Sequence, residues 1–351
     1  MEERTSKHLG DLTVLVLCGA AAGLAYMPLI SESATLLVAL KFALQGMLIA
    51  LLVFGFEFFV AQGAMSEPVR RAPFAVVFLA KTAITTLLIA LAYALGGLVL
   101  FPERFAADAA MHHLVRDIGF ALAVSGGFQL LVMVRNIIGG RVLTNILLGR
   151  YHRPLTEERL FMFVDVSGST ALAERAGALG AYAMISRFFF DVAQETVRFA
   201  GETHAYIGDA VVVTWPLAHG LENARCLRCY FGICDRIETR SAMYERDFGA
   251  VPRFRVGLHG GTVVAGECGD DKRQIVYFGD TINTAARIQE ACKEFGRPLL
   301  LSGELIGRMD LLPGYSATSL GRAKLRGREN EVELFTVERA ATQQLMNRAD
   351  L

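Results

Sequence analysis

The stretch Phe163-Val-Asp-Val-Ser-Gly-Ser-Thr170 joins the end of an apolar run to a tight polar turn. Helix-prone residues follow from Ala171 onward, so the pattern predicts a strand, a turn and a helix N-terminus. Backbone N–H groups exposed at such a turn favour phosphate, and the carboxylate of Asp165 beside them can carry the divalent cation that accompanies it. This stretch is a candidate phosphate and metal site.

A second carboxylate stands in a turn of its own. Asp209 follows Gly208 between two β-type segments, in Tyr206-Ile-Gly-Asp-Ala-Val-Val-Val213, which places it at the tip of a predicted hairpin. Two acidic groups at strand edges can hold two metal ions on one phosphoryl group. Asp165 and Asp209 together therefore predict a two-metal site.

The first part of the chain, residues 1–134, is far more apolar than the rest. Of the whole chain 53% is hydrophobic, and 35 basic residues balance 35 acidic ones, which does not favour a nucleic-acid partner. Four runs with few charges have about the 17 to 25 residues that cross a bilayer as a helix. They are residues 12–30, 36–60, 74–100 and 118–134. We expect a transmembrane domain of about four helices, with the lipid bilayer as its partner.

Charges beside these runs predict the orientation. Basic residues precede the first run and follow the second and fourth: Arg4, Lys7, Arg70, Arg71, Arg135, Arg141, Arg150 and Arg153. The loop 31–35 has no Lys or Arg. By the positive-inside rule the N-terminus and the C-terminal part are cytoplasmic. We expect a multi-pass protein of the inner (cytoplasmic) membrane whose soluble domain faces the cytoplasm.

Three charged residues interrupt the apolar runs. Lys41, Glu57 and Lys81 are costly in hydrocarbon, and they could mark a ligand or ion path. The alternative is structural: the long side chains reach the membrane face, or two of the groups form one intramembrane ion pair.

Residues 135–157 read as a helical connector that breaks near Tyr151 to Pro154, either relaying a signal or acting as a plain tether. The soluble domain covers residues 158–338 and a tail covers 339–351. Its expected elements are strand 160–165, helix 176–200, hairpin 203–215, helix 220–240, strands 253–259, 262–267 and 274–278, helix 281–295, strand 298–302 and hairpin 316–338. This alternation predicts an α+β domain with helices packed on an antiparallel-rich sheet.

Four motifs in this domain follow one another in a recognisable order. They are the turn at Asp165, the pair Gly208-Asp209, the strand Phe254-Arg-Val-Gly-Leu-His-Gly-Gly261 and the segment Gly279-Asp-Thr-Ile-Asn-Thr-Ala-Ala-Arg287. In this order they resemble the catalytic domain of class III nucleotidyl (adenylate/guanylate) cyclases. The resemblance implies a ferredoxin-like βαββαβ core, and the layout of the N-terminal half is similar to that of membrane-anchored bacterial members.

The resemblance assigns metal and phosphate ligands to the first motifs. It implies that Asp165, Asp209 and the backbone carbonyl of Val166 hold two Mg²⁺ (or Mn²⁺) ions per active site. The backbone N–H groups of the turn would then cradle the triphosphate. These belong to Gly168, Ser169 and Thr170.

It also assigns two roles to the segment after Gly279. Asn283 and Arg287 are four residues apart and share one helix face. By resemblance Asn283 positions the ribose and Arg287 stabilises charge on the α-phosphate in the transition state. Family members take these two residues and the metal aspartates from opposite protomers, so a chain that carries both sets implies a homodimer with two equivalent sites.

Near the C-terminus, the segment Leu325-Arg-Gly-Arg-Glu-Asn330 is similar to the family's basic loop that reaches the terminal phosphates. Arg326 or Arg328 stands in place of the usual Lys, and a guanidinium suits phosphate geometry. Solvated turn charge is the alternative.

The sequence departs from the family at the positions that read the base. Where adenylate cyclases carry Lys and Asp or Thr, this chain has Ala205 and Val276, and neither side chain can form a hydrogen bond. The base must then be read by backbone groups, by neighbours such as His204 or Gln274, or loosely. We expect conversion of ATP to 3′,5′-cyclic AMP and pyrophosphate. The alternatives are a guanylate or mixed-specificity cyclase, and a cyclase-fold membrane receptor with weak or no turnover.

One cysteine pair calls for a check. Cys226-x-x-Cys229 resembles half of a zinc or redox motif, but it lies in a helical stretch beside apolar residues and has no second pair. We expect ordinary buried thiols.

Overall fold

The structure is a computed structural model of the 351-residue chain. It describes residues 16–17, 19–27, 35–62, 73–100, 119, 122–123, 126–127, 129–131, 133–134, 149–270, 274–328 and 330–340. The chain divides into two compact units, Met1–Thr144 and Asn145–Leu351.

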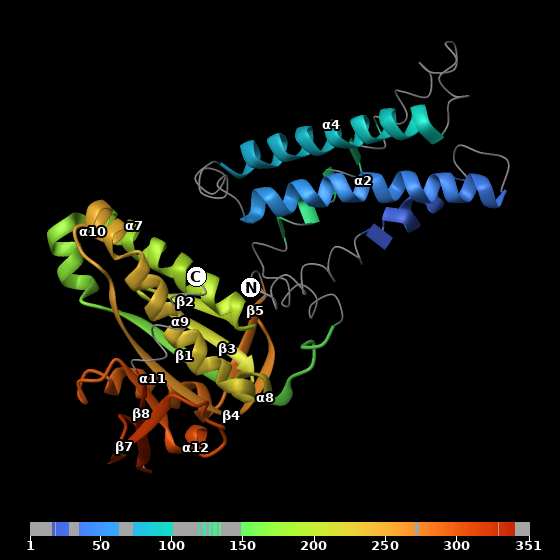
Figure 1. Ribbon diagram of the computed structural model, residues 1–351. Helices are drawn as coiled ribbons and strands as arrows, with labels where there is room; N and C mark the ends of the chain where they lie inside the picture. Colours follow the sequence, from blue (N-terminus) through green and yellow to red (C-terminus); the bar gives the residue numbers. More distant parts are fainter. Residues whose placement is uncertain are drawn as a thin grey trace. The chain divides into compact units, whose positions relative to one another are not determined.

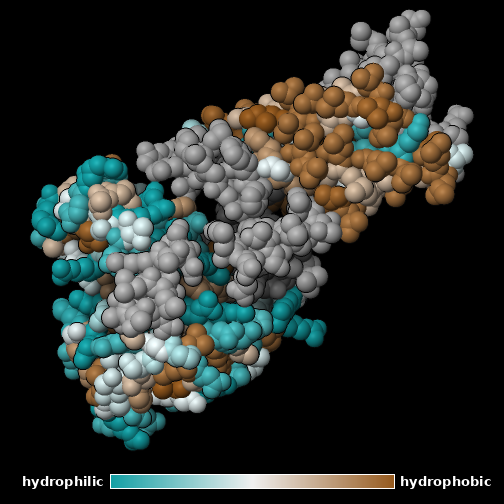
Figure 2. Space-filling view, in the orientation of Figure 1, coloured by the Kyte–Doolittle hydropathy of each residue, from teal (hydrophilic) through white to brown (hydrophobic). Residues whose placement is uncertain are grey.

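Two long apolar helices dominate the described part of the first unit. Helix α2 (Leu36–Gln62) and helix α4 (Phe74–Leu100) pack side by side (Figure 1). Both are long and apolar enough to cross a membrane, and their surface is hydrophobic over most of its length (Figure 2).

The prediction of four spans is thus supported for two of them. The predicted spans 12–30 and 118–134 are described only in pieces, of which 19–27 is the longest, and no candidate span occurs within these described pieces. The glycines at 119, 126 and 127 make the last run a weak helix.

The charged residues of these helices meet each other. Lys81 Nζ lies 2.8 Å from Glu57 Oε2, and Gln129 donates to the other carboxylate oxygen at 2.7 Å. This confirms the ion pair among the expected alternatives, and it joins Glu57 with Lys81.

The second unit is an α+β domain on a mixed sheet. Its strands are β1 (Leu155–Ser167), β2 (Glu202–Ile207), β3 (Ala210–Pro216), β4 (Arg253–Cys268), β5 (Gln274–Phe278), β6 (Leu299–Ser302), β7 (Tyr315–Ala323) and β8 (Val332–Arg339). The helices are α7 (Ser169–Arg198), α8 (Leu217–Leu221), η3 (Glu222–Ala224), α9 (Arg225–Thr239), α10 (Ser241–Phe248), α11 (Asp280–Ala291) and α12 (Gly303–Ile306).

The strand order is β2-β3-β1-β4-β6-β8-β7, with β5 paired to β4. Strands β4 and β6 run parallel and the other pairs run antiparallel. The order β4-β1-β3-β2, connected through α7 and α9, is the βαββαβ arrangement expected from the resemblance.

One strand differs from expectation. Residues 253–268 form the single strand β4, although Gly260-Gly261 predicts a break within it. A Cβ on Gly260 would lie 2.6 Å from the Leu217 side chain, and one on Gly261 would lie 2.9 Å from Thr281 Oγ1. These glycines serve close packing rather than a turn.

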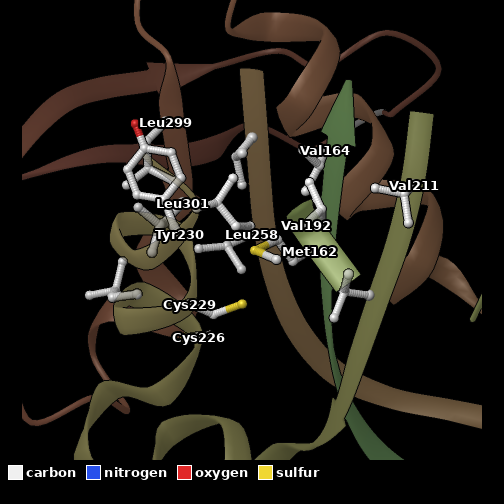
Figure 3. Close-up of a cluster of buried hydrophobic side chains, with 14 of the residues drawn as sticks. Met162, Val164, Val192, Val211, Cys226, Cys229, Tyr230, Leu258, Leu299 and Leu301 are labelled. Atoms are coloured by element: carbon white, nitrogen blue, oxygen red, sulfur yellow. The ribbon is translucent and has the colours of Figure 1, made fainter. Parts of the chain in front are cut away.

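The main core lies between one face of the sheet and helices α7 and α9. It includes Met162, Val164, Val192 and Leu258 (Figure 3). Cys226 and Cys229 are fully buried among them as free thiols, and burial raises the pKa of Cys226 to about 12. This confirms that they are ordinary core residues.

Helix α11 covers the opposite face of the sheet. Val256 and Leu258 point into the main core, so Gly257 between them faces the other way. A Cβ on Gly257 would lie 2.3 Å from the backbone nitrogen of Gln289, which shows how closely α11 rests on β4.

Candidate active site

The pairing of β1 with β3 brings the two predicted metal carboxylates together. Asp165 pairs with Ala210, the residue directly after Asp209. Val166 N–H donates to the backbone oxygen of Asp209 at 3.3 Å. Gly208 turns the hairpin with φ 61°, a left-handed conformation that suits glycine.

Electrostatics show that these carboxylates fit a cation. Burial raises the pKa of Asp165, and the negative charge of Asp209 raises it further, while hydrogen bonding from Gln289 and the charge of Arg255 oppose the rise. A divalent cation bound between two such groups relieves their repulsion. Among the described residues there is no cluster of three or more His, Cys, Asp or Glu that could hold a metal.

The predicted phosphate cradle follows immediately. Gly168 has φ 78° and precedes the first residue of α7, Ser169. The Ser169 hydroxyl donates a short hydrogen bond to Asp209 Oδ2. Thr170 is exposed on the first turn of the helix. The cradle is therefore tied directly to the second carboxylate.

A second cluster collects the predicted transition-state residues in a hollow of about 250 Å³. It is lined by Asp280, Asn283, Thr284, Arg287, Arg326, Gly327 and Arg328. The structure thus brings together four predicted residues from two distant segments. Three guanidinium groups in one hollow form a site for an anion with several phosphates.

Carboxylates of the same chain hold two of these arginines. Arg328 Nη2 lies 2.6 Å from Asp280 Oδ2, and Arg287 Nη1 lies 2.8 Å from Glu290. The amide of Asn283 donates to the Gly279 carbonyl at 3.3 Å. These contacts are partly exposed.

The two clusters face different ways in one chain. Gln289 on α11 reaches Asp165, because its Nε2 donates to Asp165 Oδ2 at 3.2 Å. Arg287 precedes Gln289 by two residues, which is roughly 200° around a helix. Arg287 and Asn283 therefore point away from their own chain's carboxylate pair.

The positions expected to read the base, Ala205 and Val276, stand on β2 and β5, which are not adjacent in the sheet. The rings of their sequence neighbours, His204 and Tyr277, lie 4.9 Å apart. Burial and the charge of Arg159 lower the pKa of His204, with the charge of Glu202 opposing. Gln274, the other candidate reader, is exposed at the start of β5.

Gln289 and Glu290 were not predicted from the sequence. Both lie on the helix that carries Arg287, but neither belongs to a motif. Their roles depend on which face of α11 meets the sheet, and the buried residues Ala285 and Ile288 mark that face.

Paired carboxylates and clustered guanidinium groups on an α+β domain define a phosphoryl-chemistry site. A model of the adenylate and guanylate cyclase catalytic domain matches residues 154–339. The chain belongs to this family of class III nucleotidyl cyclases, enzymes whose substrate is a nucleotide.

Two curated proteins extend the comparison. Adenylate cyclase 2 of Rhizobium meliloti (strain 1021) is 33% identical over 330 residues, which cover 93% of this chain and 90% of that protein. Adenylate cyclase 1 of the same organism is 28% identical over 186 residues, covering 52% of this chain and 27% of that protein. The similarity to the first relative thus extends into the N-terminal unit.

Among solved structures, a bacterial light-regulated adenylyl cyclase superposes with a TM-score of 0.53 at 18% identity. The match covers 64% of this chain and 66% of that one. At this identity the match shows the fold alone.

Proposed function

We propose that the chain is a membrane-anchored adenylate cyclase, which converts ATP to 3′,5′-cyclic AMP and pyrophosphate at sites shared by two copies. The similarity to adenylate cyclase 2 over most of both chains supports the choice of ATP. The observation that carries the shared site is the orientation of α11, with Gln289 on its own Asp165 and Arg287 directed away.

In this proposal the ribose 3′-oxygen attacks the α-phosphorus and pyrophosphate leaves. Two Mg²⁺ or Mn²⁺ ions on Asp165, Asp209 and the Val166 carbonyl would lower the pKa of the attacking hydroxyl and neutralise the triphosphate. The N–H groups of Gly168, Ser169 and Thr170 bind phosphate oxygens at the start of α7.

The second copy supplies the remaining groups. Asn283 orients the ribose by hydrogen bonding, and the Arg287 guanidinium stabilises charge that builds on the α-phosphate. Arg326 and Arg328 bind the terminal phosphates. Phosphate binding by Arg328 releases Asp280 from the 2.6 Å ion pair.

Exposed apolar side chains lie beside both the carboxylate pair and the arginine-lined hollow, which supports a dimer interface at these places. Tyr206 and Ile207, just before Asp209, are 54% and 60% exposed, and Phe278, just before Gly279, is 56% exposed. Apolar groups at the two edges of a polar site are typical of an interface.

Membrane anchoring is supported by the outward faces of α2 and α4. Leu36 is 88% exposed, Leu87 is 69% exposed and Val99 is 76% exposed, which is unfavourable in water and favourable in lipid. We include two further spans, 12–30 and 118–134, in the proposal, because both runs have about the length and apolar content that a membrane helix needs. The total of four is even, which agrees with both ends of the chain being cytoplasmic.

Complementation between two inactive chains tests the proposed function. Asp165→Ala and Arg287→Ala should each nearly abolish cyclic AMP formation by the full-length chain in detergent or vesicles. Co-expression should restore about one quarter of wild-type activity, because about half of the dimers are mixed and each mixed dimer keeps one of two sites. No restoration would refute the shared site.

A matched control comes from Arg297→Ala. Arg297 is also an ion-paired arginine, 3.2 Å from Glu338, but it lies outside the hollow. We expect this variant to keep its activity, and a loss equal to that of Arg287→Ala would mean that any removed arginine disables the domain.

A second candidate function is suggested by Ala205 and Val276, whose apolar side chains favour loose base selection. It is a guanylate or mixed-specificity cyclase, or a nucleotide-binding receptor with weak or no turnover. Separate assays with ATP and GTP, each with Mg²⁺ and with Mn²⁺, distinguish these functions. Nucleotide binding without cyclic product would favour the receptor.

A further inference from the structure

We propose that Gln289 is a positioning residue for the metal carboxylate Asp165 of its own chain, while the opposite face of the same helix serves the partner's active site. This inference rests on the proposed function. It assigns a task to a residue outside the four sequence motifs.

The contact joins two residues that are 124 positions apart in the chain. Gln289 Nε2 donates to Asp165 Oδ2 at 3.2 Å, and both side chains are partly buried. The donated hydrogen bond holds that carboxylate oxygen in one direction.

The backbone is built to hold this contact. A Cβ on Gly257 would lie 2.3 Å from the Gln289 backbone nitrogen and 2.7 Å from its Cα, so α11 approaches β4 closely at Gln289. Gly257 pairs with Phe163 on β1, two residues before Asp165. Ile288 is fully buried next to Gln289 and fixes the rotation of the helix.

A neutral amide suits this position better than a charged group. Lys or Arg would donate to Asp165 but would also compete with a cation for its negative charge, and Glu would add a third carboxylate. An amide orients one carboxylate oxygen and leaves the charge intact. Outer partners of metal ligands act in this way, and their loss typically costs about 10- to 100-fold in metal affinity.

Helix α11 then has two tasks in two sites. Its sheet-facing side holds Asp165 through Gln289, and its other side presents Asn283 and Arg287 to the hollow. In a dimer the first task belongs to the helix's own site and the second to the partner's.

The role of Gln289 at Asp165 is tested by measuring Mn²⁺ binding to the full-length chain. The electron paramagnetic resonance signal of free Mn²⁺ reports how much of the metal remains unbound. Gln289→Met keeps the length of the side chain without its donor, and we expect about tenfold weaker binding than in wild type. Glu294→Gln removes an exposed charge just beyond the end of α11 and should leave binding unchanged. Wild-type binding by Gln289→Met, or equal weakening in both variants, would overturn the role.

The fold of each variant can be checked in the same sample. The single tryptophan, Trp215, is fully buried in the cyclase unit, so its fluorescence reports on that unit within the whole chain. Weakened Mn²⁺ binding with an unchanged Trp215 urea midpoint supports positioning. If the loss of Mn²⁺ binding were matched by unfolding of the variant at the assay condition, packing rather than donation would explain the loss.

Mixed dimers test on which chain Gln289 acts. The starting pair is an Arg287→Ala chain with an Asp165→Ala chain, which keeps one site. Gln289→Met added to the chain with intact Asp165 should raise the metal concentration for half-maximal activity about tenfold. The same change on the Asp165→Ala chain should have little effect, and equal effects would overturn the assignment.

The two levels of failure are separable. A starting pair without activity refutes the shared site of the proposed function. Mn²⁺ binding by the single variants then still decides whether Gln289 positions Asp165.

Discussion

Arg159 is buried against Tyr151, with its Nη2 donating to the tyrosine hydroxyl at 3.1 Å. Arg159 is 5% exposed and Tyr151 is 1% exposed. The guanidinium also lies 2.7 Å from Glu157 and packs on the Tyr277 ring at 5.1 Å from its centre. Burial raises the pKa of Tyr151, so its hydroxyl stays protonated at neutral pH.

Removing this hydroxyl should destabilise the cyclase unit. In Tyr151→Phe the buried Arg159 loses an acceptor, and we expect a loss of about 1 to 3 kcal/mol in the free energy of unfolding. Urea unfolding followed by Trp215 fluorescence measures it. Tyr182→Phe is the control, because Tyr182 is 72% exposed, and similar losses in both variants would argue against the buried pair.

Adding one methyl group at Gly257 should separate α11 from the sheet. The Cβ would meet backbone atoms of Gln289 at 2.3 and 2.7 Å, and backbone cannot rotate away as a side chain can. We expect Gly257→Ala to lower the free energy of unfolding by about 1 to 3 kcal/mol, as measured by urea unfolding. We also expect the folded variant to lose most of its cyclic AMP formation.

A glycine on the same strand provides the comparison for this substitution. In Gly266→Ala the new Cβ would lie 3.4 Å from Pro154, an ordinary contact distance. This variant should keep its stability and activity. If both alanine variants behaved alike, close approach at Gly257 would not be the cause.

His259 should make the stability of the cyclase unit depend on pH. Its Nδ1 lies 2.7 Å from Ser302 Oγ. Burial lowers its pKa below 6.5, Arg328 lowers it further, and Glu304 and Asp280 oppose the shift. The unfolded chain therefore takes up a proton near pH 6.5 that the folded chain takes up only at lower pH. Stability is fully present above pH 6.5 and falls as the pH drops from 6.5 towards the folded pKa.

Replacing this imidazole should flatten that part of the curve. Urea midpoints of His259→Gln between about pH 7 and 5 should fall less steeply than those of wild type. His152→Gln, which changes an exposed histidine, should leave the slope as it is. An unchanged slope in His259→Gln would assign the pH dependence to other groups.

Polar side chains at the base positions should sharpen the preference for ATP. Ala205→Lys combined with Val276→Asp supplies the hydrogen-bonding groups that the family uses for adenine. We expect this double variant to raise the ratio of kcat/KM for ATP to kcat/KM for GTP by at least about tenfold. Ala205→Met with Val276→Leu adds apolar bulk only and should not raise the ratio. An unchanged ratio in the polar variant would show that the base is read elsewhere.

The sequence predicted the elements whose cause is local. The apolar run before Asp165 and the glycine at 168 produced the strand, turn and helix as expected, although α7 begins at Ser169 and not at residue 176. Gly177, with φ 73° and ψ 163°, interrupts the helix one residue after the predicted start. The break predicted at Gly260-Gly261 is wrong, because side chains of distant elements occupy the space above these glycines.

In the candidate site, too, the residues in local motifs could be predicted, and the residue that depends on distant packing could not. Asp165, Asp209, Asn283 and Arg287 belong to motifs, and the structure places them in two clusters. Gln289 is recognisable only once α11 is known to lie on β4, because a glutamine two residues after an arginine has no local meaning. For Gln289 the sequence carries too little signal, whereas for the membrane spans it carries more than the structure supports. Apolar composition marks four runs, and the described residues support two spans.

If the sites are shared and membrane-anchored as proposed, the opposite faces of α11 also determine how turnover depends on the amount of protein. A site that needs two chains forms in proportion to the square of the chain density while most chains are single. Confinement to a bilayer raises the effective concentration at which chains meet. A small increase in expression would therefore cause a larger increase in cyclic nucleotide, without any effector bound to the protein.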